Sequence, residues 1–158
     1  MKERSETEIF NKAAAYCAAA ERCCSEVQSK LTSWEVPDDL RSKVTARLLK
    51  ENYVDESRYC RSFVNDKFRF NKWGRIKIAQ MLRYKGIAPE VIGEQLLQID
   101  EAEYRETLSE LLLAKRKSVR ARNSFEEHGK LVRFALGRGF EMAEVRRALE
   151  QSGYAEVD

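Results

Sequence analysis

The residues best suited to chemistry in this sequence are basic side chains, and they concentrate in its middle. Residues 58–85 hold nine basic side chains and a single acidic one, Asp66. Lysine and arginine gathered in this way create a positive field that attracts polyanions such as nucleic-acid phosphates. We therefore predict a polyanion-binding site, and its candidate residues are Lys67, Arg69, Lys72, Arg75, Lys77, Arg83 and Lys85.

An alternative interpretation of the basic segment is that acidic side chains of the same chain neutralise its positive charge inside the fold. Residues 86–114 hold seven acidic side chains and one basic one, Arg105, and these acids are suitable partners for the preceding cations. Phe68, Phe70 and Trp73 lie among the cations, where aromatic rings can stack on bases. At helical spacing such rings belong more often to a core, which is the reading that we favour for them. A second basic cluster follows, at Lys115, Arg116, Lys117, Arg120 and Arg122.

Side chains for catalysis or metal binding do not form a known motif. Cys17, Cys23, Cys24 and Cys60 make no Cys-x-x-Cys pair, and His128 is the single histidine, so the spacing of a zinc site is absent. The sequence also lacks a glycine-rich phosphate loop and a nucleophile motif. We expect neither an enzyme nor a bound cofactor or metal. Four reduced, buried thiols fit a cytoplasmic protein, and no apolar run approaches the roughly 20 residues that cross a bilayer.

The segments that must position the basic residues have the pattern of helices. Apolar residues recur at spacings of three and four, which predicts an amphipathic helix in each segment. We expect Asp55 and Ser124 to cap two of the helices. Glycine at positive φ should end two others, at Gly86 and Gly139. The predicted helices span residues 6–19, 22–33, 37–51, 55–70, 75–85, 89–99, 101–121, 124–137 and 141–151.

The helix ends reveal an internal repeat. Residues 31–36, 82–87 and 135–140 align at offsets of 51 and 53 residues, and a short helix follows each of them. We therefore expect an all-α fold of three tandem three-helix repeats that form an elongated, curved array. The predicted repeats are 1–53, 54–100 and 101–158. Such an array offers a long surface to an extended partner rather than a deep catalytic pocket.

The stretch from Val54 to Ile87 resembles the RecX family, bacterial regulators of the RecA recombinase. The middle repeat of that family has an acidic pair, an arginine, an aromatic and a small residue, then Phe-Val. A glycine, an isoleucine, a leucine and Lys-Gly-Ile follow. These places are taken here by Asp55, Glu56, Arg58, Tyr59, Cys60, Phe63, Val64, Gly74, Ile78, Leu82, Lys85, Gly86 and Ile87. Arg22, Ser25, Glu26, Lys30 and Leu31 match the opening repeat, so the resemblance covers roughly residues 13–151.

The chain departs from the family pattern in two places. Tyr59-Cys60 replaces the usual Phe-Ala, a change that a packed helix tolerates. Trp34-Glu35 replaces the Lys-Gly that usually closes the second helix of the first repeat. Without that glycine, the geometry of this turn is the local feature that the sequence does not predict.

The resemblance implies a function without a catalytic site. It implies a protein that binds the RecA filament on single-stranded DNA, limits filament growth, and inhibits ATP hydrolysis and strand exchange by RecA. Such a protein modulates recombination and DNA repair within the SOS response. We expect a cytoplasmic monomer that does not bind membranes, with RecA and single-stranded DNA as partners. Two alternatives stay open: a helical-repeat module that binds single-stranded nucleic acid directly, and a non-catalytic scaffold for another protein.

Overall fold

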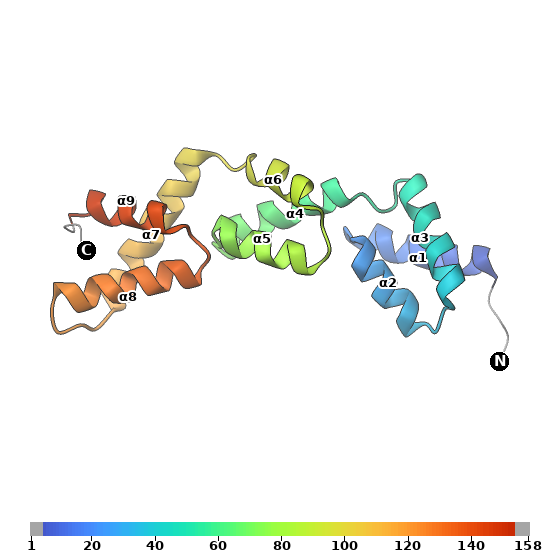
Figure 1. Cartoon of the computed structure of the whole chain (residues 1–158), viewed down its shortest axis with the longest axis horizontal. Helices are drawn as coiled ribbons and strands as arrows, with labels where there is room; N and C mark the ends of the chain where they lie inside the picture. Colours follow the sequence, from blue (N-terminus) through green and yellow to red (C-terminus); the bar gives the residue numbers. More distant parts are fainter. Residues whose placement is uncertain (1–4, 154–158) are drawn as a thin grey trace. The chain divides into compact units, whose positions relative to one another are not determined.

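A computed structural model describes residues 5–153 and shows that this part of the chain is entirely helical. It contains nine α-helices and no β-strand (Figure 1), so the predicted all-α class is confirmed. Each helix lies where the apolar spacing predicts one, and α6 and α7 end about one turn early. The helices are α1 (Glu6–Ala19), α2 (Cys24–Ser33), α3 (Asp38–Lys50), α4 (Glu56–Arg69), α5 (Arg75–Tyr84), α6 (Pro89–Leu96), α7 (Glu101–Ser118), α8 (Ser124–Gly137) and α9 (Met142–Gln151).

The helices fold into two compact units. The first unit runs to Phe63 and includes Leu82–Gln95, and the second contains Val64–Met81 and the chain from Leu96 onward. The boundary therefore crosses α4 and α5 and separates the last residue of α6 from the rest of that helix. The predicted repeat boundaries, after residues 53 and 100, stay a prediction.

In the first unit, α1, α2 and α3 pack against one another (Figure 1). Their buried residues recur one helical turn apart, as Val27 and Leu31 do in α2 and Val44 and Leu48 do in α3. A spacing of four places both side chains on one face of a helix, so each helix turns an apolar stripe inward. The core of the unit is formed by Ile9, Phe10, Ala13, Ala14, Cys17, Val27, Leu31, Val36, Val44, Leu48 and Val54.

The turn after α2 keeps a glycine-like conformation without glycine. Glu35 has a φ of 60°, in the left-handed region. The amide of Val36 donates to the carbonyl oxygen of Leu31 at 3.1 Å, which closes the helix in the manner of a Schellman turn. A side chain in this region costs roughly 1–2 kcal/mol, so the turn survives the loss of glycine at an energetic cost.

In the second unit, α7, α8 and α9 pack together (Figure 1) around a centre of aromatic rings. Tyr104 and Phe140 are fully buried, and their ring centroids lie 5.1 Å apart. Phe68 from α4 also stacks on Tyr104, with a distance of 5.7 Å between the ring centroids. Because α4 belongs to this unit only from Val64 onward, Phe68 anchors the C-terminal end of that helix.

The start of α5 is held by the turn between α8 and α9. The amide of Gly74 donates to the carbonyl oxygen of Arg138 at 2.8 Å, and that of Ile76 donates to Gly139 at 3.0 Å. The amide of Arg75 donates to the hydroxyl of Tyr104 at 3.0 Å. The first N–H groups of a helix have no partner within it, so these three bonds satisfy donors that would otherwise need water or a cap.

Glycine has the predicted positive φ at both helix ends, with 83° at Gly86 and 96° at Gly139. The predicted cap at Asp55 is confirmed, because its carboxylate accepts from the amide of Arg58 at 3.0 Å. The prediction for Ser124 is wrong by one residue. Asn123 accepts the bond from Glu126, since its extended backbone precedes the helix and Ser124 is already helical.

Candidate nucleic-acid interface

The basic residues of the second unit gather around the turn between α4 and α5. Both Lys67 and Lys77 direct their ammonium groups at the indole of Trp73, with Nζ to ring-centroid distances of 5.0 and 4.5 Å. The amide of Trp73 donates to the carbonyl oxygen of Lys67 at 3.0 Å, which holds the ring beside the end of α4. We call Lys67, Trp73 and Lys77 the Trp73 cluster. It places two positive charges on one ring, where cation–π attraction restrains both side chains.

The aromatic residues of this segment divide between core and surface. Phe68 is buried, as we predict for a helical aromatic residue. Phe70, however, is 78% exposed, and Trp73 is half-buried under its two lysines. The prediction that Phe70 belongs to the core is therefore wrong. This residue comes directly after the last residue of α4, and its side chain points away from the apolar stripe of that helix. Lys72, next in this turn, is exposed and has a φ of 58°.

Two of the predicted binding residues are tied to the acidic helix α7. Arg75 pairs with Glu101 at 2.6 Å and with Glu141 at 2.8 Å. Arg69 pairs with Glu103 at 3.0 Å. The alternative in which acidic and basic segments pair inside the fold thus holds for Arg69 and Arg75.

Glu141, whose side chain is 31% exposed, forms the centre of this network. Its carboxylate accepts from the Tyr104 hydroxyl and from Arg75, whose guanidinium carbon lies 3.9 Å from the centroid of the Tyr104 ring. Burial alone would raise the pKa of Glu141, but the hydrogen bonds from Tyr104 and Arg75 outweigh it and lower that pKa. Burial, followed by the hydrogen bond to Glu141, raises the pKa of Tyr104. The network therefore holds an ionised carboxylate and a neutral phenol.

The remaining predicted residues lie in the first unit. Lys85 pairs with Glu26 at 3.2 Å, and its carbonyl oxygen accepts from the hydroxyl of Ser25 at 2.7 Å. Both contacts fasten the end of α5 to α2. Arg83 is exposed. Lys72 and Arg83 are therefore exposed in their own units, and Lys67 and Lys77 lie half-buried on the Trp73 ring, whereas Arg69, Arg75 and Lys85 form ion pairs.

The predicted binding residues do not include a basic side chain and an exposed aromatic ring that both lie on α8. Phe125 is 71% exposed at the start of α8, and Arg133 lies two turns further along the same helix. Gly129 lies between these two residues in the sequence. A glycine inside a helical pattern can have a packing or functional reason, so Gly129 could have indicated this part of α8 as a candidate surface.

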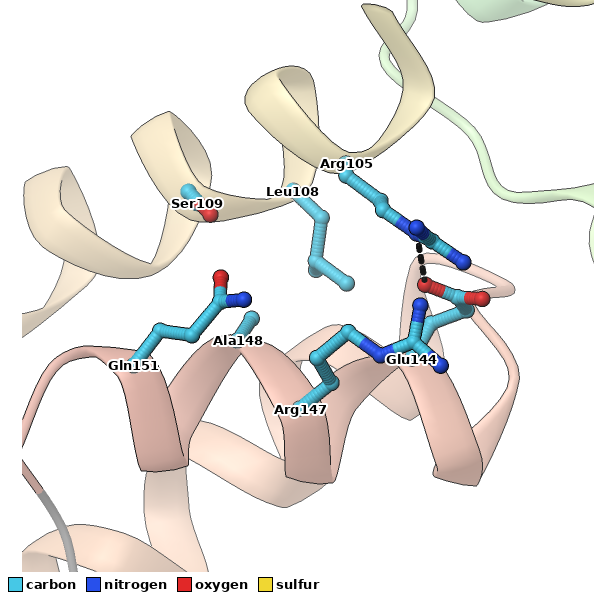
Figure 2. Close-up of a pocket in the computed structure, with 7 residues that line it drawn as sticks. All are labelled: Arg105, Leu108, Ser109, Glu144, Arg147, Ala148 and Gln151. Atoms are coloured by element: carbon cyan, nitrogen blue, oxygen red, sulfur yellow. Dashed lines mark hydrogen bonds and ion pairs between the residues drawn. The ribbon is translucent and has the colours of Figure 1, made fainter. Parts of the chain in front are cut away.

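One hollow of the second unit is too small to hold a substrate. Figure 2 shows a hollow between α7 and α9, where Arg105 donates to Glu144 at 3.1 Å. Its volume of about 10 Å³ admits at most one water molecule. Within residues 5–153, no three His, Cys, Asp or Glu side chains are grouped to hold a metal ion. In the same range, no helix is long and apolar enough to cross a membrane.

The surroundings of Cys24 and Cys60 make these two thiols poor nucleophiles. All four cysteines are free thiols, and Cys17, Cys23 and Cys60 are buried. Burial raises the pKa of Cys24 to about 12 and that of Cys60 to about 11. A thiol must lose its proton to act as a nucleophile, so these side chains behave as small apolar groups.

Comparison with known proteins points to a single family. Residues 55–96 match the model of the second three-helix domain of RecX, and residues 102–149 match that of the third. Together they cover more than half of the chain. The prediction of tandem three-helix repeats is thereby confirmed, whereas no match tests the predicted binding residues.

Curated relatives carry the name "Regulatory protein RecX". The relative from Streptococcus gordonii is 26% identical over 140 residues, which are 89% of this chain and 54% of the relative. The relative from Prosthecochloris aestuarii is 26% identical over 153 residues, with 96% of this chain and 97% of the relative covered. The chain thus spans about half the length of the streptococcal relative and nearly all of the other.

Two solved structures share the fold. A crystal structure of a regulatory protein RecX superposes with a TM-score of 0.86 at 20% identity, over 92% of this chain and 71% of that one. RecX from Lactobacillus salivarius superposes with a TM-score of 0.81 at 22% identity, over 92% of this chain and 95% of that one.

Proposed function

Because the chain belongs to the RecX family, we propose that it is a negative regulator of the RecA recombinase. It binds the RecA filament on single-stranded DNA in the cytoplasm, limits filament growth, and inhibits ATP hydrolysis and strand exchange. In this way it modulates recombination and DNA repair, without a catalytic site of its own. The observation that carries the proposal is the match to two successive RecX domains over residues 55–96 and 102–149.

The basic residues have two roles in this proposal. Lys67, Lys72 and Lys77 at the α4–α5 turn contact DNA phosphates or an acidic surface of the filament, and Arg83 makes a separate contact of the same kind from the first unit. Lysines suit this task because ammonium groups neutralise phosphates without reading sequence. Arg69 and Arg75 support the α4–α5 turn of the second unit through their ion pairs with α7, and Lys85 holds the end of α5 against α2 in the first unit.

Binding to preformed filaments tests the proposal. The labelled chain is mixed with RecA filaments on single-stranded DNA, held by a non-hydrolysable ATP analogue, and its affinity is compared with that for DNA alone. We expect tighter binding to the filament, and at least a tenfold loss at low salt for the double variant Lys67→Glu, Lys77→Glu. The matched control reverses Arg146 and Arg147, two exposed cations on α9, and should bind like the wild type.

A second function is favoured by the Trp73 cluster itself. A Trp ring held under two ammonium groups, with an exposed Phe70 three residues before it, is also suited to single-stranded nucleic acid without a protein partner. In that case the chain would bind DNA alone as tightly as the filament. Equal affinities would contradict the regulatory proposal and support the direct DNA-binding module.

A further inference from the structure

A second basic surface lies where α7 ends and α8 begins. Residues 115–133, which we call the α7–α8 corner, hold seven basic side chains and two acidic ones, Glu126 and Glu127. The proposal above does not use this surface. Its excess of positive charge lies on helix ends and on the intervening connection, where most of the cations are exposed.

The two acids of the corner are already engaged by its own cations. Glu126 accepts from Arg122 at 2.8 Å and pairs with Lys130 at 3.4 Å. Glu127 pairs with Arg116 at 3.1 Å. The hydrogen bond from Arg122, aided by that from Lys130, lowers the pKa of Glu126, so this carboxylate stays ionised. The surplus cations leave the corner net positive.

The corner also holds an open hollow of about 290 Å³. It is lined by Arg122, Asn123, Phe125, Glu126, Gly129 and Arg133. Phe125 and Gly129 are four residues apart and therefore share one face of α8. A Cβ at position 129 would lie 3.3 Å from the Arg133 guanidinium, so the absence of a side chain helps to keep the hollow open.

The side chains around the hollow combine an aromatic ring with two guanidinium groups and the carboxylate of Glu126. Phe125 is 71% exposed, although burial would stabilise a phenylalanine. The Arg122 side chain is 90% exposed, and Arg133 is exposed as well. An exposed ring beside guanidinium groups matches the way in which proteins hold unpaired bases, by stacking on the base and binding its phosphates.

We propose that the α7–α8 corner binds single-stranded nucleic acid, with Phe125 stacked on one base and Arg122 and Arg133 bound to neighbouring phosphates. A duplex fits less well, because its bases are stacked inside the helix and leave no face for Phe125. Nucleic-acid binding at this site requires neither RecA nor the Trp73 cluster. Its experimental test is therefore independent of the test of the proposed function.

The phosphate contacts are tested with the full chain and a fluorescent oligothymidylate, by anisotropy across a series of salt concentrations. For Arg122→Gln, Arg133→Gln we expect at least tenfold weaker binding at low salt. The slope of log affinity against log salt should fall by about 1.4, since each phosphate contact on a single strand contributes about 0.7. The matched control, Arg146→Gln, Arg147→Gln on α9, removes the same charge and should leave both quantities unchanged.

The stacking contact is tested by Phe125→Ala in the same assay. Loss of one base–aromatic stack weakens binding by at least about fivefold. The salt slope should stay as in the wild type, because no charge is removed. Leu136→Ala removes another exposed apolar side chain of α8 and serves as the control.

Filling the hollow separates binding from folding. Gly129→Leu occupies the space under Arg133, whereas Gly137→Leu makes the same change on the same helix where a Cβ meets nothing within 4 Å. Both should preserve helix content, since leucine favours a helix more than glycine does. We expect weaker DNA binding only for Gly129→Leu. Wild-type binding by all the corner variants would overturn the proposal, as would competition by polyglutamate equal to that by unlabelled oligothymidylate.

Discussion

Gly74 and Gly139 meet backbone to backbone, so closely that neither has room for a side chain. A Cβ on Gly74 would lie 2.3 Å from the carbonyl oxygen of Gly139. A Cβ on Gly139 would lie 2.3 Å from the Cβ of Lys77, and the φ of 96° there disfavours any side chain. The contact joins the start of α5 to the α8–α9 turn, and it therefore positions the basic end of α5 within the second unit.

We expect Gly139→Ala to lower the free energy of unfolding by at least about 3 kcal/mol, because overpacking and backbone strain act together. Gly74→Ala should cost about 2 kcal/mol through overpacking alone. Chemical denaturation followed by circular dichroism measures both. Gly137→Ala, in open space and without positive φ, is the control and should be neutral or stabilising. Wild-type stability of the Gly139 variant would show that this contact does not form.

Arg75 is predicted to act in stability rather than in binding. Its side chain is only 19% exposed and pairs with Glu101 and Glu141, so Arg75→Glu places three acids together. We expect the free energy of unfolding to fall by about 2–3 kcal/mol. Lys77→Glu, two residues along, should leave stability nearly unchanged and weaken filament binding instead. The reverse pattern would assign Arg75 to the binding surface.

The same network predicts how stability changes at acid pH. Because the pKa of Glu141 is lowered on folding, its ionised form stabilises the protein fully above the unfolded value of about 4.3. That stabilisation is lost as the pH falls through the lower folded pKa. Stability of Glu141→Gln should therefore depend less on pH below about 4.5 than that of the wild type. Identical acid unfolding curves would contradict the network.

The turn at Glu35 predicts a stabilising substitution. Glycine takes a φ of 60° without a Cβ clash, so Glu35→Gly should raise the free energy of unfolding by about 1 kcal/mol. Gly86→Ala is the converse control, since its φ is 83° and a Cβ there meets nothing within 4 Å. It should cost about 1 kcal/mol through backbone strain alone. Thermal unfolding of both variants decides whether the left-handed turn is present at residue 35.

The raised pKa values of half-buried Cys24 and buried Cys60 predict slow alkylation and a loss of stability at alkaline pH. At pH 8, iodoacetamide should modify Cys24 and Cys60 far more slowly in the folded chain than in denaturant. Because both pKa values are raised on folding, the stabilisation is complete below the unfolded value of about 8.5 and is lost as pH rises through about 11 and 12. Replacing both cysteines with alanine should remove this part of the alkaline loss. Equal alkylation rates in the two states would contradict the burial.

The sequence predicts the helices well because each depends on local apolar spacing, and it predicts the ends at Gly86 and Gly139 because glycine favours positive φ. It does not predict the positive φ of Glu35, since nothing in the side chain of glutamate favours that conformation. The ion pair between Arg75 and Glu141 joins residues 66 apart in the chain. Many acids were equally available as partners, so only the packed fold selects this one.

The candidate site was predictable to a similar extent. Charge concentration identifies the basic segment, but the net charge of a segment does not reveal which cations face an acid. The sequence likewise does not distinguish Phe68 from Phe70. Both lie at the end of α4, but Phe68 is buried in the core and Phe70 is exposed on the surface. Their difference depends on where α4 ends and on the position of Tyr104, which come from tertiary packing.

The most direct test of the central claim is the rate of ATP hydrolysis by RecA on single-stranded DNA, with and without this protein, at two salt concentrations. We predict inhibition at well below one molecule per RecA protomer, and its loss in the double variant Lys67→Glu, Lys77→Glu but not in Arg146→Glu, Arg147→Glu. The absence of inhibition at a molar excess of folded, helical protein would contradict it.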